Sequence, residues 1–344
     1  MPVGGLAGAG KEGRPMNECG TVQAICLSEE KGTVKTAVQR SVLEAGQGFA
    51  GDAHAGDGHR QISLLAADDV EAMRAKGLPD LAPGAFGENL VVAGVDLAAL
   101  GLGSRLAIGA DAVLEISQRG KVCHSRCAIY HRTGDCIMPR NGVFARVVEG
   151  GVVACGDPVR VDCPVPVKVF QAVVLTIFDK GSRGERVDTA GPAVAGLLEK
   201  GLGAHIYGTE ILPDDRDLIA ARLAHFSNGH SIDLVVAVGG TGFAPRDVTP
   251  EAVAAVAERL TPGLDEAMRA ASRTSTPHAI LSRSVSGVRG STQLVSLPGS
   301  ERAASENLLA ILPALGHGLA KLRGDGSDCA APKANRLQVL AEGS

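Results

Sequence analysis

The sequence predicts two domains: a mainly-β N-terminal domain, either a barrel or a sandwich, and a C-terminal α/β domain with a mostly parallel sheet. The chain has 344 residues, and one domain usually takes about 100–200. Short β segments with frequent glycine turns occupy residues 20–161, a pattern typical of barrels and sandwiches. Over residues 169–323, apolar strands alternate with helices instead, which indicates parallel strands joined by crossovers. Residues 162–168, which hold two prolines, are the predicted linker.

Composition excludes several functional classes. The formal charge is −4, and no run of lysine and arginine is interleaved with aromatic residues, so we expect no nucleic-acid partner. No apolar stretch reaches the roughly 18 residues of a membrane helix, and the first residues lack the apolar segment of a signal peptide. We therefore expect a cytoplasmic protein without a membrane partner, whose eight cysteines are reduced. Residues 1–19 and 324–344 are expected to be a disordered extension and a disordered tail.

The elements of the first domain follow from short runs of strand-forming residues between turns. The segments predicted as strands are residues 22–27, 61–65, 89–92, 105–108 and 112–116. Apolar residues at helical spacing predict one helix over residues 67–76.

The second domain opens with a continuous apolar run over residues 170–177, as in a strand buried on both faces. The further strands are predicted at residues 204–211, 232–238 and 293–297. Helices are predicted at residues 192–200, 215–225, 264–272 and 302–319, with another beginning near residue 250.

Polar loops follow each predicted strand of the second domain. In an open parallel sheet, ligands bind beyond the carboxyl ends of the strands, so we expect these loops to meet at one edge. The Gly-Gly-Thr-Gly loop offers several backbone N–H groups to an anion or a flat ring. The loop residues are Asp179 and Asp188, Asp214 and Asp215, Gly239, Gly240, Thr241 and Gly242, Asp247, and Pro298, Gly299 and Ser300.

Asp214 and Asp247 could together hold Mg²⁺, which prefers carboxylate, phosphate and water oxygens. Simpler interpretations stand beside this one. The glycine loop could be only a turn, and Asp214, Asp215 and Asp247 could be only helix caps. Thr249-Pro250 is predicted to be an N-cap followed by proline at the first helical position.

The run Gly239-Gly-Thr-Gly-Phe-Ala-Pro-Arg-Asp-Val-Thr-Pro-Glu251 resembles the signature of the MogA family, the molybdopterin adenylyltransferases. The resemblance covers about residues 170–322. Two positions depart from the family pattern, which usually has Ser before Asp179 and Pro after Ser300, where this chain has Phe178 and Glu301. Further matching segments are Asp188-Thr-Ala-Gly-Pro, Leu212-Pro-Asp214, Thr261–Met268, Ala279–Arg283 and Leu297–Ser300.

The resemblance implies transfer of AMP from ATP to the phosphate of molybdopterin, with Mg²⁺ as cofactor, by a homotrimer. It makes Asp214 and Asp247 the catalytic and metal-binding pair. It also implies that Arg283 faces phosphate charge, and that Ser282, Arg283 and the loops at 239–242 and 298–300 shape the cofactor-binding site together with Asp179 and Asp188.

In the first domain, Cys123 is the candidate catalytic residue. Lys121, His124 and Arg126 surround it, and nearby positive charge lowers a thiol pKa. Two other interpretations are a zinc site that uses Cys123, Cys127, Cys136 and a histidine, and a buried, unreactive Cys123.

This domain resembles the MOSC domain, the C-terminal domain of molybdenum-cofactor sulfurases, over residues 20–161. The resemblance implies a β-barrel that binds the molybdenum cofactor and carries sulfur on Cys123, with a persulfide donor and molybdoenzymes as further partners. The matching segments are Gly51–His54, Arg60–Ser63, Gly84–Leu90, Gly101–Gly103, Ser117-Gln118, Cys123 and the closing residues 146–161.

The sequence thus predicts a bifunctional enzyme of molybdenum-cofactor biosynthesis. Two alternatives stay open: a non-catalytic carrier or chaperone of molybdopterin, which would keep the pocket without needing both carboxylates, and a zinc-dependent regulator.

Overall fold

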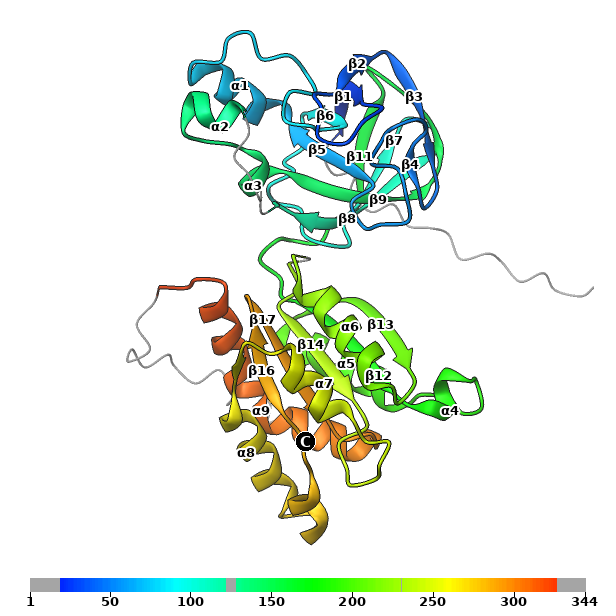
Figure 1. The fold of residues 1–344 in the computed structure, drawn as a ribbon, viewed down its shortest axis with the longest axis vertical. Helices are drawn as coiled ribbons and strands as arrows, with labels where there is room; N and C mark the ends of the chain where they lie inside the picture. The colour runs from blue at the N-terminus through cyan, green and yellow to red at the C-terminus, as the bar shows by residue number, and fades with distance from the viewer. Residues whose placement is uncertain (1–18, 122–127, 230, 327–344) are drawn as a thin grey trace, which may run out of the picture.

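The computed structural model describes residues 19–121, 128–229 and 231–326, which form two domains joined by one connection (Figure 1). The first domain is a β-barrel, and the second is a six-stranded sheet between helices. No helix within the described ranges is long and apolar enough to cross a membrane.

Within the described residues, seven strands close the barrel in the order β11-β7-β8-β9-β5-β6-β1, and β1 pairs with β11 to complete the ring. Closure leaves none of these strands with an unpaired edge. β2 (Thr36–Val38) extends the sheet beside β1, and β10-β3-β4 form a small separate sheet. The barrel strands are β1 (Cys19–Leu27), β5 (Ile62–Ala66), β6 (Leu90–Ala93), β7 (Arg105–Ile108), β8 (Ala112–Arg119), β9 (Val143–Glu149) and β11 (Pro158–Cys163).

The strands predicted in this domain are all present, and helix α1 (Ala67–Ala75) is confirmed. Cys19 lies in β1, and Asp162 and Cys163, expected in the linker, lie in β11. The strands β2, β9 and β11 were not predicted. The same holds for the strands β3 (Arg40–Glu44), β4 (Gly48–Phe49) and β10 (Gly151–Ala154) and for the short helices α2 (Ala128–Thr133) and α3 (Met138–Asn141). β3 buries only Leu43, so it shows too little alternation to be recognised from sequence.

The second domain is built around β12 (Gln171–Ile177), whose side chains are all buried. Its sheet has the order β13-β12-β14-β17-β16-β15. Pairs among the first four strands are parallel, and the last two pairs are antiparallel. The other strands are β13 (His205–Leu212), β14 (Leu234–Val238), β15 (Arg259–Leu260), β16 (Ser286–Arg289) and β17 (Thr292–Leu297).

Helices cover both faces of this sheet, as the continuous apolar strands require. Ala172 and Val174 pack toward α5 (Ala190–Leu202) and α9 (Glu301–Leu322). The alternate residues of β12 belong instead to the cluster that contains α6 (Arg216–Ser227) and α7 (Thr249–Val256). The remaining helices are α4 (Asp179–Ser182), α8 (Pro262–Ser272) and the 3-10 turn Pro277–Leu281.

The main strands and helices predicted for this domain are present, with ends shifted by one to a few residues. Thr249 was predicted to be an N-cap, which is wrong: it is the first residue of α7, and Val248 precedes the helix. The strands β15 and β16 and helix α4 were not predicted.

The connection between the domains is hydrogen-bonded along its length. The N–H of Val165 donates to Ser104 Oγ at 2.9 Å, and its carbonyl accepts from Gly101 at 2.6 Å. The N–H of Val167 donates to the carbonyl of Ala99 at 2.9 Å. The barrel therefore holds the first part of the connection in place.

Arg323, just after α9, holds the other end. Its guanidinium donates to the carbonyls of Lys168 at 2.9 Å and Val169 at 2.8 Å. It pairs with Asp233 at 2.6 Å and lies over the Phe170 ring at 4.8 Å. One side chain thus joins the end of the last helix to the start of the second domain.

We predict that Arg323→Gln lowers the free energy of unfolding by about 2 kcal/mol, because Asp233 loses its charged partner in a buried position. Urea denaturation followed by circular dichroism measures this change. Arg302→Gln is the matched control, since it removes an exposed Arg302–Glu306 pair and should leave the midpoint unchanged. An unchanged midpoint in Arg323→Gln would show that this arginine does not stabilise the fold.

Candidate functional site

The candidate site lies where the order of the parallel strands reverses. The chain runs from β12 outward to β13 and then returns to β14 on the other side of β12, which leaves a crevice at the carboxyl ends of β12 and β14. Gly239 follows β14 with φ +117°, and a Cβ there would lie 2.2 Å from the carbonyl oxygen of Ile177. Only glycine lets the loop after β14 pass this close to the end of β12.

Asp179 and Asp214 join the ends of β12 and β13 by reciprocal hydrogen bonds. Asp179 Oδ1 accepts from the N–H of Asp214 at 3.0 Å, and Asp214 Oδ2 accepts from the N–H of Asp179 at 3.2 Å. The other oxygen of Asp214 lies toward the glycine loop, 3.4 Å from where a Cβ of Gly240 would be. Asp179 therefore positions Asp214 at the crevice.

A polar pocket of about 170 Å³ brings Asp214 and Asp247 together with Gly239, Gly240 and Gly299. Burial raises the pKa of Asp214, and the nearby carboxylates of Asp179 and Asp247 raise it further, although a backbone hydrogen bond and Arg246 act against this. The pocket is thus rich in carboxylate oxygens that would be stabilised by a cation.

These residues fit a hard divalent cation such as Mg²⁺, which takes one or two carboxylates and completes its shell with water and phosphate oxygens. Asp214 and Asp247 supply the carboxylates. The buried Thr249 Oγ1 is a further oxygen close to the glycine loop. It has no hydrogen-bond partner and lies 2.5 Å from the position that a Cβ of Gly240 would take, so a polar ligand beside this loop would give it a partner.

A larger pocket of about 400 Å³ lies on the other side of the glycine loop. Thr241 and Gly242 line it, together with Ser282 and Pro298. Because Gly299 lines the smaller pocket, the loops after β14 and β17 separate the two spaces. The arrangement places a pocket of about 400 Å³ beside a smaller pocket lined by carboxylates.

Several predicted site residues cap helices or accept hydrogen bonds from other protein groups. Asp215 caps α6 by accepting from the N–H groups of Asp217 and Leu218, so the cap interpretation holds for Asp215. Ser300 caps α9. Asp188 lines the smaller pocket, but its oxygens accept from Thr176 Oγ1 and from the first turn of α5.

Arg283 was expected to face phosphate charge, but in the structure its guanidinium donates hydrogen bonds to other groups of the protein. It donates to the carbonyl of Gly242 at 2.7 Å, to the carbonyl of Asp247, and to Glu251. Its backbone N–H also donates to the carbonyl of Thr241 at 3.0 Å. Arg283 therefore holds the glycine loop in shape.

Two cations that the sequence interpretation did not select line the smaller pocket instead. Arg246 lies beside Asp214 and Asp247, and Arg186 enters from the segment before α5. Arg186 lies 5.7 Å from the Phe178 ring, so the departure at position 178 packs against this arginine. Arg246 directly precedes Asp247, so its place in the sequence could have identified it as a residue of the pocket. No motif near Arg186 in the sequence indicates that it lines the pocket.

In the first domain, Cys123 and Cys127 lie outside the described residues. Nearby, Gly120 has φ +62°, and a Cβ there would lie 2.2 Å from the carbonyl of Pro139. No group of three or more potential metal ligands occurs in the part of the chain that the structure describes, and the zinc interpretation rests on thiols beyond that part.

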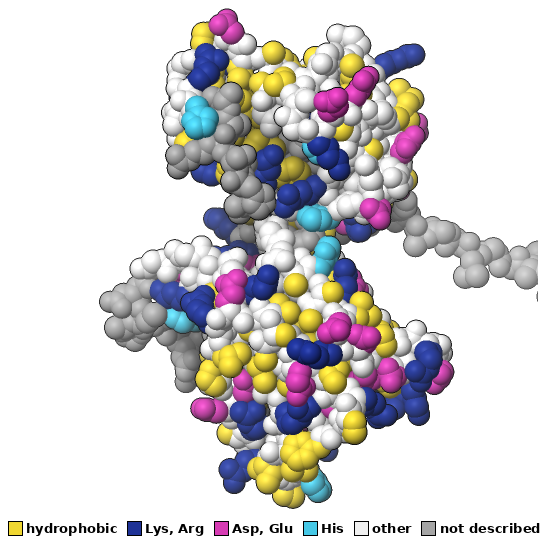
Figure 2. All heavy atoms as spheres, in the orientation of Figure 1, with side chains coloured by type: hydrophobic (Ala, Val, Ile, Leu, Met, Phe, Trp, Pro, Cys, Tyr) yellow, Lys and Arg dark blue, Asp and Glu magenta, His cyan; other side chains and the backbone are white. Residues whose placement is uncertain are grey.

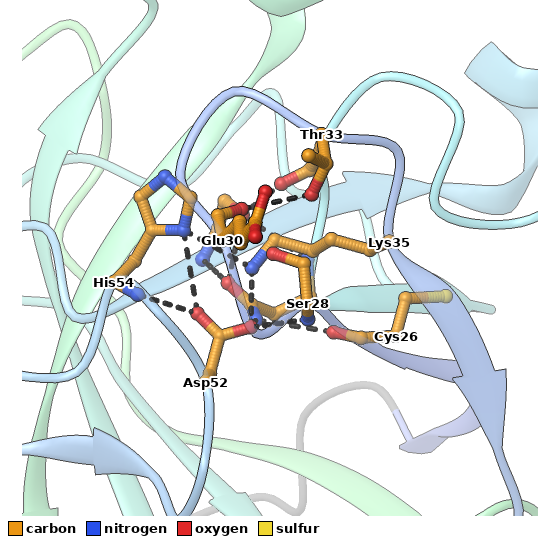
Figure 3. A network of polar contacts seen from close by, with 10 residues as sticks. Cys26, Ser28, Glu30, Thr33, Lys35, Asp52 and His54 are labelled. Carbon is orange, nitrogen blue, oxygen red and sulfur yellow. Dashed lines mark hydrogen bonds and ion pairs between the residues drawn. The ribbon is translucent and has the colours of Figure 1, made fainter.

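Asp52, in the Gly51–His54 segment, is the centre of a buried polar network (Figure 3). It accepts from Lys35 Nζ at 2.5 Å, and both side chains are 1% exposed. The N–H groups of Ser28 and His54 and the amide of Asn89 also donate to it. Burial alone would raise the pKa of Asp52, but these hydrogen bonds outweigh it and hold the pKa below its usual value.

The neighbouring Cys26 is fully buried, and burial together with Glu88 raises its pKa to about 12. Glu88 is itself buried and accepts from the N–H groups of Gly84 and Phe86. These matching segments thus form a buried polar network, and Cys26 is a packing residue of the apolar cluster that includes α1.

Comparison with known proteins adds family information for both domains. Residues 173–317 match the family described as "Probable molybdopterin binding domain", and residues 50–160 match the MOSC domain. The chain is 39% identical over 143 residues to a molybdopterin adenylyltransferase of Helicobacter pylori, covering 41% of this chain and 81% of that protein.

Larger relatives match over the same domain. A molybdenum cofactor biosynthesis bifunctional protein of Chlorobaculum tepidum is 34% identical over 156 residues, 45% of this chain and 49% of that protein. Gephyrin of Dictyostelium discoideum is 36% identical over 155 residues, 42% of this chain and 21% of that protein. The chain therefore spans about half or less of these larger relatives.

We predict that Asp52→Asn costs about 3 kcal/mol at pH 7, because Lys35 is left buried without its partner. The folded pKa of Asp52 lies below the unfolded one, so its stabilisation is present above about pH 4 and is lost as the pH falls further. The difference between wild type and variant should therefore shrink toward acid.

Urea denaturation at pH 3, 5 and 7 measures this. Asp111→Asn, an exposed carboxylate of the same domain, is the control and should leave the profile unchanged. A wild-type-to-variant difference that does not change with pH would contradict the assigned role of the Asp52 carboxylate.

Proposed function

The chain belongs to the molybdopterin adenylyltransferase family through its second domain, which is fused to a MOSC domain, and we propose that this second domain transfers AMP from Mg-ATP to the phosphate of molybdopterin. The observation that carries the proposal is the pair Asp214 and Asp247 beside the Gly-Gly-Thr-Gly loop. These residues line the small polar pocket at the switch point of the sheet, and the larger, ring-sized pocket lies beyond the glycine loop.

In the proposed reaction, an oxygen of the molybdopterin phosphate attacks the α-phosphorus of ATP. A phosphorus–oxygen bond forms there, the bond to the bridging oxygen of the β-phosphate breaks, and pyrophosphate leaves. The chain supplies positioning and neutralisation of charge rather than a covalent nucleophile. Bound Mg²⁺ would supply positive charge beside the phosphates.

The protein's own groups have distinct parts in this proposal. Asp214 and Asp247 would hold the metal, and N–H groups of the glycine loop would donate to the phosphates. Arg186 and Arg246 counter negative charge in the small pocket, and the larger pocket beside Ser282 takes the pterin ring. Arg283 acts through the loop that it holds.

A second candidate is a non-catalytic molybdopterin carrier. It would need the larger pocket but not two carboxylates that share one small pocket, where partial burial raises the pKa of Asp214 and the charges of Asp179 and Asp247 raise it further. The carboxylates therefore favour the enzyme. The homotrimer that the resemblance implies stays a prediction, supported by exposed apolar side chains such as Phe243 and Ile280 on this domain.

For the first domain, we propose that the barrel binds molybdenum cofactor and carries sulfur on Cys123. The support is the MOSC match and the basic residues Lys121, His124 and Arg126 beside Cys123 in sequence. In the loading step, the Cys123 thiolate would attack the outer sulfur of a donor protein's persulfide, the donor's thiolate would leave, and Cys123 would carry the sulfur as a persulfide.

We predict that Asp247→Asn reduces AMP transfer by at least about 10²-fold, because a charged group that positions metal and phosphates is lost. Formation of pyrophosphate and adenylylated molybdopterin from molybdopterin and Mg-ATP measures the rate. Wild-type turnover in this variant would remove Asp247 from the mechanism. A wild-type protein that binds molybdopterin without turnover would support the carrier instead.

Asp215→Asn is the matched control for this experiment. Asp215 caps α6 outside both pockets, and asparagine is an equally good N-cap. Its turnover and stability should remain those of the wild type. Asp214→Asn should behave like Asp247→Asn.

We predict that Cys123 is the most rapidly alkylated thiol and Cys26 the slowest, because Cys26 is buried with a raised pKa. Limiting iodoacetamide followed by peptide mass analysis of metal-free protein ranks the thiols. Cys19 and Cys163, both exposed, are internal references. Faster labelling of these references than of Cys123 would leave the sulfur-carrier proposal without its chemical basis.

A further inference from the structure

A cleft of about 830 Å³ lies between the two domains. Figure 2 shows lysine, arginine and histidine side chains gathered where the domains meet. From the first domain, Asp57, His59, Gln61 and Arg146 line the cleft, and from the second, Tyr207, Arg222, His225 and Phe226 do so. We propose that this cleft binds a flat heteroaromatic ligand that carries a negatively charged group, contacted by both domains at once.

The cleft is separate from the adenylylation site. The two domains contact each other at the beginnings of the parallel strands and at the end of α6. Gly103 of the barrel contacts the ring of His205, the first residue of β13. The ring centroids of His59 and His225 lie 6.0 Å apart. Asp214 and Asp247 lie beyond the opposite ends of the strands. The inference therefore does not rest on the proposed transfer of AMP.

Two arginines, one from each domain, provide the positive charge. Arg146 is held by Glu115 at 2.6 Å, and Arg222 Nε donates to Glu210 at 2.8 Å. Each guanidinium has five N–H donors in one plane, so a carboxylate on one edge orients the group and leaves other donors for a ligand. An anion held between them would be recognised by oriented donors rather than by net charge.

Aromatic surfaces provide the preference for a flat ring. Aromatic residues make up only 3% of the chain, yet Tyr207 and Phe226 both line this cleft. Arg222 lies 4.8 Å from the Phe226 ring centroid, a stacked arrangement that also suits planar ligands. Burial raises the pKa of Tyr207, so its hydroxyl remains a neutral donor at physiological pH.

The size of the cleft matches this ligand class, since pockets for small molecules usually measure about 300–1,000 Å³. Nucleotides and pterins that carry a phosphate or carboxylate share the required chemistry. Binding would connect the two domains through Arg146 and Arg222, so it should slow local opening on both sides of the cleft.

Hydrogen exchange of the full-length protein, read by mass spectrometry, tests the proposal with four probes: AMP, pterin-6-carboxylate, adenosine and inorganic phosphate. We expect at least a threefold slowing of exchange in segments 57–61, 146–148, 205–210 and 222–226 with AMP, with the pterin carboxylate, or with both. AMP alone would identify a nucleotide site and the pterin alone a pterin site. No protection by any probe, or equal protection by phosphate alone, would overturn the proposal.

Variants separate this cleft from the other site. Arg222→Lys keeps the charge but loses the planar donor set, and it should raise the probe concentration for half-maximal protection about tenfold. Tyr207→Phe removes one hydroxyl with little risk to folding and should raise it about threefold. Arg302→Gln, on an exposed pair outside the cleft, should have no effect.

Asp247→Asn should keep full protection of the cleft even where transfer of AMP is lost, which distinguishes failure of one proposal from failure of the other. Unchanged protection in both Arg222→Lys and Tyr207→Phe would show that the probes bind elsewhere.

Discussion

The parallel alignment of β12, β13, β14 and β17 is the constraint on which the second domain depends. Parallel strands all end at one edge, so the polar loops after them meet without any pairing of their own. The close passage of Gly239 past Ile177 and the reciprocal bonds between Asp179 and Asp214 then fix the loops relative to one another. The same alignment places every strand beginning at the opposite edge, where the barrel lies (Figure 1).

Much of this architecture could be predicted because buried parallel strands are continuous apolar runs. The choice between neighbouring carboxylates could not be predicted from the residues alone. Asp214 and Asp215 are adjacent, and only the turn into α6 makes one a cap and turns the other into the pocket. Arg283 shows the same limit, since a positive residue near a phosphate loop can serve the loop's carbonyls instead of the ligand.

The first domain was harder to predict because its stabilising contacts join distant segments. Closure of the barrel depends on the pairing of β1 with β11, and the sequence of neither strand indicates which strand it pairs with. The buried pair Lys35–Asp52 has no local sequence signal either, since lysine in a loop is ordinarily exposed. Its cost of desolvation is offset by the several donors that converge on Asp52, an arrangement visible only after folding.

The length of β12 has a consequence for the fusion of the two domains. Seven parallel residues span roughly 20 Å, and helices cover the sheet on both faces. A molecule the size of a pterin or a nucleotide cannot pass through that packed layer within one subunit. A shared polypeptide therefore guarantees equal numbers of the two domains in the cell, while a molecule that passes from the barrel side to the crevice at the far edge of the sheet must travel around that layer or reach a neighbouring copy.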